Sequence, residues 1–88
     1  MELCSALLYI MAQKGISQQQ LSRLSNINRS HLYKILHGKH QPSLNLLQRL
    51  ANALGVKTWE IMYLAELLQI LSDFVPMSHD SYAERVLR

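Results

Sequence analysis

The chain has 88 residues, of which 49% are apolar, and it contains only three glycines and two prolines. This size and composition predict one small helical domain and argue against a disordered or loop-rich chain. The single cysteine, Cys4, excludes a disulfide framework within the chain and is compatible with a reducing, cytoplasmic environment.

The charges are unevenly distributed along the chain. No acidic residue lies between Leu3 and Trp59, whereas all nine Lys and Arg residues except Arg85 and Arg88 fall there. Every acidic residue except Glu2 follows Trp59. A basic front half and an acidic rear half indicate a polyanionic partner for the front, although a merely solvated basic surface would give the same pattern.

The first predicted helix covers residues 3–14. Its apolar residues at positions 3, 7, 8, 10 and 11 follow the helical period and predict one broad buried face, and Gly15 suits a left-handed C-terminal cap. The segment is apolar enough to suggest a signal peptide. We reject that interpretation because Glu2 stands where a signal peptide carries positive charge.

A second, shorter helix is predicted over residues 18–25. Ser17 has the spacing to a glutamine three residues later that is typical of a capping box. Leu21 and Leu24 are predicted to face inward. Asn26 then occupies a turn position where a residue tolerant of positive φ is needed, and Asn is the best choice after Gly.

Two further helices are predicted before residue 55. Asn28 is expected to cap a third helix over residues 29–37, which Gly38 ends, and Ser43 is expected to cap a fourth over residues 44–54. Their inward-facing residues are predicted to be Leu32, Ile35 and Leu36 in the third helix and Leu44, Leu47, Leu50, Ala51 and Leu54 in the fourth.

A fifth helix is predicted from Trp59 to about Val75, with Thr58 as its cap, and Pro76 discourages continuation. No membrane span is predicted, because Glu66 and Gln69 interrupt its apolar run. The helix carries one apolar stripe for the domain's own core, at Ile61, Leu64, Ala65, Leu68 and Leu71, and a second stripe at Tyr63, Leu67, Ile70 and Phe74.

The second stripe needs a partner on a chain this small. We interpret Tyr63, Leu67, Ile70 and Phe74 as a homodimer interface, in which a second copy of the chain covers this face. The alternative is that the tail, residues 76–88, which is predicted to be weakly helical or flexible, folds back over it.

Residues 17 to 39 have the pattern of a helix-turn-helix unit, in which two short helices are joined by a three-residue turn and the small Ser22 lets them cross closely. Together with the flanking helices, the chain resembles the Cro/repressor-like (Xre-type) family of DNA-binding transcriptional regulators. The resemblance covers roughly residues 5 to 62. It rests on GISQQQLS, NINRSHLYKILHGK and QPSLNLLQRLANALGV at the spacings of the family.

The resemblance implies an all-α, five-helix, lambda-repressor-like DNA-binding domain over residues 1–62, with the helix-turn-helix at about 17–37. The second apolar stripe described above makes the helix at 58–75 an extended C-terminal dimerisation helix. The implied protein is a cytoplasmic regulator of prokaryotic or phage type that works without a cofactor or catalytic activity. Its expected function is that of a homodimeric repressor that reads an inverted repeat in double-stranded DNA.

The matching family positions also imply which residues touch DNA. The third helix is then the recognition helix, whose start enters the major groove and reads base edges. The base-reading residues are expected to be Arg29, Ser30, His31 and Lys34. The residues expected to contact the DNA backbone are Gln18, Asn28, Tyr33, His37, Lys39, Ser43 and Asn45.

Two departures from the family pattern stand out. The family commonly pairs an Arg late in the first helix with a Glu at the end of the recognition helix, and these positions hold Met11 and Leu36. Joint replacement of a buried ion pair by apolar side chains is often neutral or stabilising. In addition, Ser25 stands at a usually apolar position and Leu24 at a usually polar one, which suggests a slight rotation of the second helix.

Two other functions were considered. The four histidines at positions 31, 37, 40 and 79 raise the possibility of a metal site, but no Cys or acidic residue lies close in sequence to complete it, and no metal is expected. The main alternative to a DNA regulator is a protein-interaction module, such as a toxin-neutralising antitoxin or a regulator-binding partner. Its acidic, apolar C-terminal half would then hold the other protein.

Overall fold

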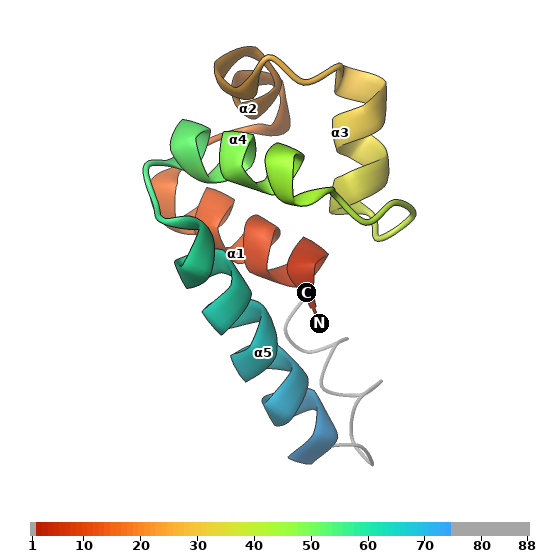
Figure 1. Ribbon diagram of the computed structural model, residues 1–88, viewed down its shortest axis with the longest axis vertical. Helices are drawn as coiled ribbons and strands as arrows, with labels where there is room; N and C mark the ends of the chain where they lie inside the picture. Colours follow the sequence, from red (N-terminus) through yellow and green to blue (C-terminus); the bar gives the residue numbers. More distant parts are fainter. Residues whose placement is uncertain (1, 75–88) are drawn as a thin grey trace.

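The computed structural model describes residues 2–74, which form five α-helices and no strand (Figure 1). The predicted all-α, five-helix architecture is therefore confirmed. The tail predicted over residues 76–88 lies outside the described residues. The helices are α1 (Leu3–Lys14), α2 (Gln18–Ser25), α3 (Arg29–Leu36), α4 (Leu44–Leu54) and α5 (Thr58–Phe74).

Local side-chain caps set the starts of the middle helices as predicted. Ser17 Oγ accepts a hydrogen bond from Gln20 N at 3.1 Å while Gln20 Oε1 accepts one from Ser17 N at 2.8 Å, which completes a capping box at α2. Ser43 Oγ caps α4 by accepting from Leu46 N at 3.2 Å. At the end of α2, Asn26 adopts the predicted left-handed conformation with φ 57°.

Two helix ends differ from the prediction. The third helix ends at Leu36, and His37 is its C-terminal cap rather than its last residue. Thr58 is the first residue of α5 rather than its cap. The cap comes instead from Glu60, whose Oε1 accepts a hydrogen bond from Lys57 N at 2.9 Å. A carboxylate in the first turn can satisfy a free amide there and also complements the helix dipole.

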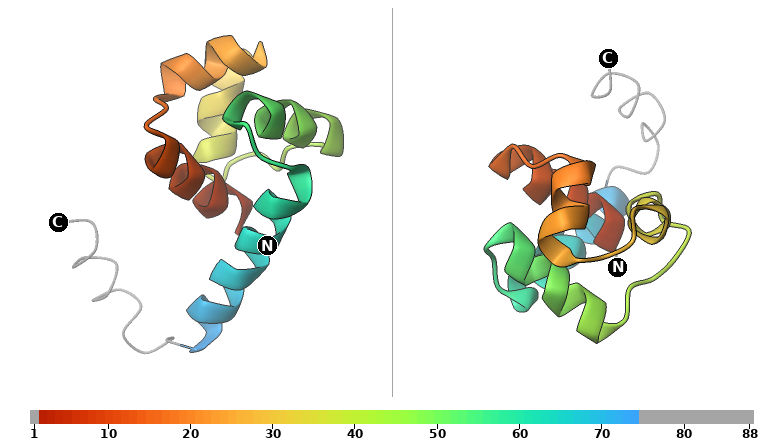
Figure 2. Two further views of the ribbon diagram at one scale, coloured as in Figure 1. Left: turned by 90° about the vertical axis from the view of Figure 1, so that its left-hand side faces the viewer. Right: turned by 90° about the horizontal axis from the view of Figure 1, so that it is seen from above.

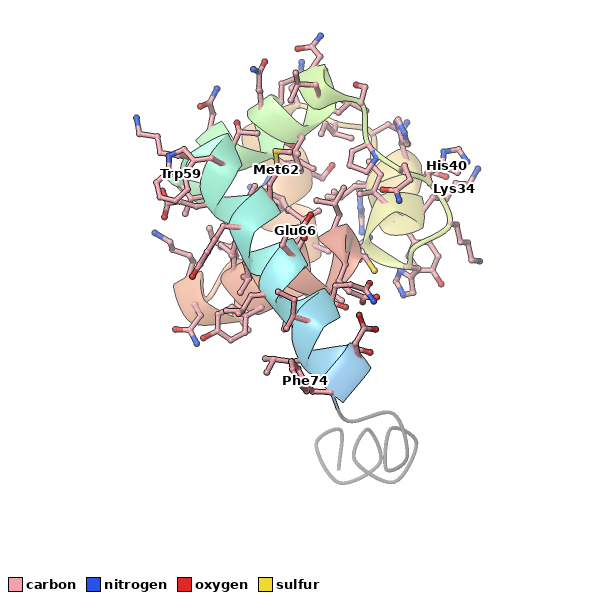
Figure 3. The ribbon with its side chains drawn as sticks, turned by 60° about the horizontal axis from the view of Figure 1, so that its bottom comes forward. Lys34, His40, Trp59, Met62, Glu66 and Phe74 are labelled. Carbon is pink, nitrogen blue, oxygen red and sulfur yellow. The ribbon has the colours of Figure 1, made fainter. Side chains whose placement is uncertain are left out.

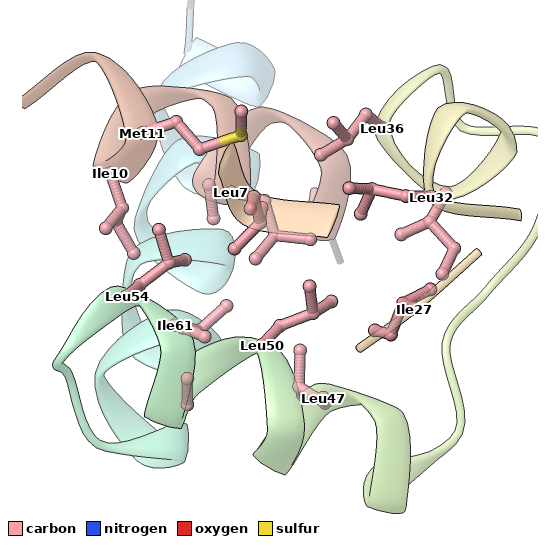
Figure 4. Packing of buried hydrophobic residues seen from close by; sticks show 14 of the residues in the cluster. Leu7, Ile10, Met11, Ile27, Leu32, Leu36, Leu47, Leu50, Leu54 and Ile61 are labelled. Atoms are coloured by element: carbon pink, nitrogen blue, oxygen red, sulfur yellow. The ribbon is translucent and has the colours of Figure 1, made fainter. Parts of the chain in front are cut away.

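One hydrophobic core joins all five helices (Figure 4). α5 packs against α1 and α4, α2 packs against α3 and α4, and α1 also contacts α3. The largest fully buried side chains come from every helix: Leu7, Leu21, Leu32, Ile35, Leu50 and Ile61. None of the helices within residues 2–74 is both long and apolar enough to cross a membrane.

The C-terminal half of α5 extends beyond the body formed by the other four helices (Figure 2). Figure 1, which is drawn with the longest axis vertical, places α2 and α3 at one end of the molecule and the end of α5 at the other.

Four of the leucines predicted to face inward are exposed instead: Leu8, Leu24, Leu44 and Leu71. In α2, the buried position belongs to Ser25, which is 5% exposed, while Leu24 is 60% exposed. Ser25 is tolerated there because its hydroxyl donates to the carbonyl oxygen of Leu21 at 2.6 Å. The suggested rotation of α2 is therefore wrong, since the usually apolar position of the family still faces the core.

Met11 and Leu36 both lie in the core, at 7% and 3% exposure, on the contacting helices α1 and α3 (Figure 4). At the positions where the family carries opposite charges, this chain thus buries two apolar side chains in the same cluster. Because neither position carries a charge in this chain, folding does not have to desolvate an ion pair here, and apolar packing holds the two side chains in place.

We expect Leu36→Glu to lower the free energy of unfolding by about 3–5 kcal/mol, because it buries a carboxylate without a partner. Adding Met11→Arg should recover much of this loss by restoring the ion pair. Thermal unfolding of the single and double variants measures both effects. A double variant that melts no higher than Leu36→Glu would contradict the pairing of these two positions.

Candidate nucleic-acid interface

The turn between α2 and α3 is held by buried polar contacts. Ser22 is 8% exposed, and its hydroxyl donates to the carbonyl oxygen of Ile27 at 2.6 Å. Ile27 itself is buried in the core from the middle of the turn. The small side chain at position 22 thus allows the close crossing predicted from the sequence, and it also fixes the backbone of the turn.

Arg49 of α4 clamps the same turn from the other side. Its Nε and Nη2 atoms donate to the carbonyl oxygen of Ser25 at 3.3 and 3.0 Å, and Nη2 also donates to the carbonyl oxygen of Asn26 at 2.5 Å. These carbonyls belong to the C-terminal end of α2, where they have no partner within the helix. Sequence reasoning missed this role and counted Arg49 only as part of the basic front half.

The helix α3, expected from the sequence to be the recognition helix, begins at a well-satisfied cap. Asn28 Oδ1 accepts hydrogen bonds from Ser30 N at 2.8 Å and from His31 N at 3.2 Å. The predicted cap is therefore confirmed, and it occupies the acceptor oxygen of Asn28. Any contact of Asn28 with a phosphate must use its amide nitrogen, which is a donor.

The outward face of α3 is accessible and polar. Arg29, Ser30, Tyr33 and Lys34 are exposed, and His31 is half-buried with its ring edge-on to His40 at a centroid distance of 5.7 Å. Figure 3 shows Lys34 and His40 on the opposite side of the domain from Trp59 of α5. All four predicted base-reading residues thus come from one helix, and three of them are exposed.

An aromatic stack closes the C-terminal end of α3. The rings of Tyr33 and His37 lie parallel within 23°, with their centroids 3.8 Å apart, and Lys39 Nζ lies 5.7 Å from the centroid of the Tyr33 ring. His37 Nδ1 is 2.9 Å from the carbonyl oxygen of Tyr33. Three residues predicted separately as backbone contacts are therefore one preorganised group. The spacing of four residues between the two rings is the signal that could have predicted the stack.

The remaining predicted backbone contacts lie at two other helix starts. Gln18, the first residue of α2, is half-buried, and Ser43 and Asn45 at the start of α4 are exposed. The hydroxyl oxygen of Ser43 is used in capping α4, but its hydroxyl proton remains free to be donated. The sequence therefore predicted an accessible set, drawn from α2, α3 and α4.

The charges of the described helices are unevenly distributed. None of the helices α1 to α4 carries an Asp or Glu, and the acidic residues of the helices, Glu60, Glu66 and Asp73, all lie on α5. The other described acid, Glu2, precedes α1 and lies near Ile35 and His40. Within residues 2–74, no cluster of three or more His, Cys, Asp or Glu side chains could hold a metal ion. The arrangement suits an interface for a polyanion.

A family model of helix-turn-helix domains matches residues 7–59, which is more than half of the chain. The protein belongs to the Cro/repressor-like helix-turn-helix family. This confirms the resemblance described above and makes the protein a DNA-binding helix-turn-helix regulator. No curated protein and no solved structure matched the chain. The helix-turn-helix match ends at Trp59, so nearly all of α5 lies outside the part shared with the family.

We expect Arg49→Ala to lower the free energy of unfolding by about 1–3 kcal/mol, because two carbonyls at the helix-turn-helix turn lose a charged donor. Arg23→Ala on the exposed face of α2 removes the same charge and should change it by less than about 0.5 kcal/mol. Chemical denaturation compares the two variants. Equal destabilisation by both variants would show that the loss of a positive charge, and not the loss of the hydrogen bonds to the turn, lowers the free energy of unfolding.

Proposed function

We propose that this protein is a homodimeric, sequence-specific repressor that places α3 in the major groove of an inverted repeat. The observation that carries this proposal is the outward face of α3, which is exposed, basic and free of acidic residues. In a helix-turn-helix protein, this is the surface that meets DNA.

Base readout is assigned to Arg29, Ser30, His31 and Lys34. Arg29 is the first residue of α3, and the cap by Asn28 fixes the backbone of that turn. The guanidinium therefore extends from a rigid segment of backbone. Arg and Lys donate to guanine O6 and N7, and a good bidentate contact discriminates by about 1–3 kcal/mol. Ser30 can serve either as donor or as acceptor.

Contacts to the DNA backbone are assigned to residues on either side of α3. They fix the register of α3 in the groove and carry little sequence information. Lys39 and His37 lie at the C-terminal end of α3, and Ser43 lies at the free amide end of α4, which favours an anion. The full set is Gln18, Asn28, Tyr33, His37, Lys39, Ser43 and Asn45.

The dimer interface is assigned to the second apolar stripe of α5. Its four side chains, Tyr63, Leu67, Ile70 and Phe74, are 63%, 39%, 48% and 81% exposed. An apolar stripe of this length is unusual on a small monomer. Two-fold pairing would present two recognition helices, and a dimer of this kind reads half-sites about 34 Å apart.

A second candidate function is supported by the acidic residues on the same helix. Glu60, Glu66 and Asp73 flank the apolar stripe, and α5 lies almost entirely outside the family match. A different protein with a basic, apolar surface could therefore occupy α5, as in an antitoxin. A protein that stays monomeric in isolation but still binds DNA would favour this function over the homodimer.

Random-site selection followed by sequencing tests the readout. We expect the wild type to select an inverted repeat, and Arg29→Ala to lose preference at one position in each half-site, at a cost of about 1–3 kcal/mol. Lys39→Ala should weaken all sequences alike and reduce the salt dependence of binding by about one counterion per protomer. If Arg29→Ala keeps the wild-type preference, Arg29 does not read a base.

Sedimentation equilibrium tests the dimer with a matched pair of variants on α5. Leu67 is 39% exposed and Met62 is 37% exposed, but only Leu67 belongs to the assigned interface (Figure 3 shows Met62). We expect Leu67→Glu to produce monomers, because a dimer would bury its charge. Met62→Glu should leave the dimer intact. Dissociation by both variants, or by neither, contradicts this interface.

A further inference from the structure

The hydrogen bond of His37 determines where the proton of its ring lies. Nδ1 is 2.9 Å from the carbonyl oxygen of Tyr33, and a carbonyl oxygen can only accept a hydrogen bond. Nδ1 must therefore carry the proton. In a neutral imidazole only one nitrogen is protonated, so Nε2 then presents a lone pair to the solvent.

A phosphate oxygen also can only accept a hydrogen bond. Neutral His37 would therefore turn a lone pair towards an anion. We propose that His37 binds a DNA phosphate only as the imidazolium, so that each protomer takes up one proton at Nε2 when DNA binds. This inference rests on the proposed function, and in particular on the backbone contact assigned to His37.

Rotation of the His37 ring by 180° does not offer an alternative to this proton uptake. A turn of 180° would bring a carbon atom to the carbonyl of Tyr33 in place of Nδ1 and would lose the hydrogen bond. The parallel stack on the Tyr33 ring, at 3.8 Å between centroids, holds the ring plane. The carbonyl of Tyr33 also accepts from the backbone nitrogen of His37 at 3.0 Å, which keeps the two residues in one helical turn.

His37 directly follows the last residue of α3 and is its C-terminal cap. Its own helix and the following loop carry Arg29, His31, Tyr33, Lys34, Lys39 and His40. Of the elements that pack against α3, α1 carries Cys4, Tyr9 and Lys14, with Glu2 just before it, and α2 carries Arg23.

The sign of the effect follows from the proton uptake. A histidine ordinarily titrates between pH 5 and 8. Because the complex holds more protons than the free protein and DNA, the DNA affinity falls as the pH rises. Each coupled proton gives about a tenfold change per pH unit at its limit, and a dimer with two such sites gives about a hundredfold change.

The test measures affinity for a duplex that carries the selected inverted repeat, from pH 5.5 to 8.5 at constant ionic strength. The full-length wild type, His37→Gln and His40→Gln are compared by fluorescence anisotropy. Gln retains a neutral donor that does not titrate. We expect His37→Gln to lose about one proton per protomer from the slope of log affinity against pH, and His40→Gln to keep the wild-type slope. An unchanged slope in His37→Gln overturns the inference.

A second measurement separates this inference from the proposed function. The ¹⁵N chemical shifts of the imidazole ring report the tautomer of His37 in the free protein, without DNA. We expect Nδ1–H in the neutral form, and a dominant Nε2–H tautomer overturns the inference even if DNA binds. Absence of DNA binding at every pH refutes the proposed function and the phosphate contact together. DNA binding with a wild-type slope in His37→Gln refutes the proton coupling alone.

Discussion

The fork of Arg49 on the carbonyl oxygens of Ser25 and Asn26 is the contact on which the geometry of the helix-turn-helix depends. It joins α4 to the end of α2 at the residue where the chain turns towards α3. Asn26 is in the left-handed conformation there, and the hydroxyl of Ser22 holds the next carbonyl, that of Ile27. The orientation of α3 relative to α2 therefore depends on polar contacts to the backbone as much as on apolar packing.

The rest of the molecule divides into two surfaces around one core. The basic face of α3 lies at one end, and the exposed stripe of α5, with the acidic side chains of the same helix, extends from the other. The face proposed to bind DNA and the face proposed to bind a second copy of the chain therefore do not overlap. The family match ends at Trp59, so it includes all of α3 and almost none of α5.

The caps and turns were predictable from sequence because they are local. The oxygen of Ser17, Asn28 or Ser43 reaches amides within three residues, so the residue type and its position are enough to predict each helix start. The errors arose where a residue's orientation depends on distant neighbours. Leu24 and Ser25 differ by one position, and only the packing of α2 against α4 decides which of them is buried.

At the candidate site, too, the sequence predicted what depends on the helical period and missed what depends on side-chain conformation. The exposure of Arg29, Ser30 and Lys34 followed from the helical period of α3. The group formed by Tyr33, His37 and Lys39 was predicted as three separate contacts, since the stack between the rings and the side-chain bond to a helix carbonyl depend on rotamers. That bond also gives His37 a defined proton position, and the pattern of residue types contains no information about it.

The sequence by itself determined the five helices, the caps Ser17, Asn28 and Ser43, and the helix-turn-helix family, because these depend on short-range hydrogen bonds and on the period of apolar side chains. Only the tertiary structure decided that Arg49 clamps the turn, from a helix 23 and 24 residues away in the chain. It also decided that Met11 and Leu36 share one core and that the stripe of α5 stays uncovered within residues 2–74. Such contacts arise from where whole helices come to lie, which no local pattern of residues specifies.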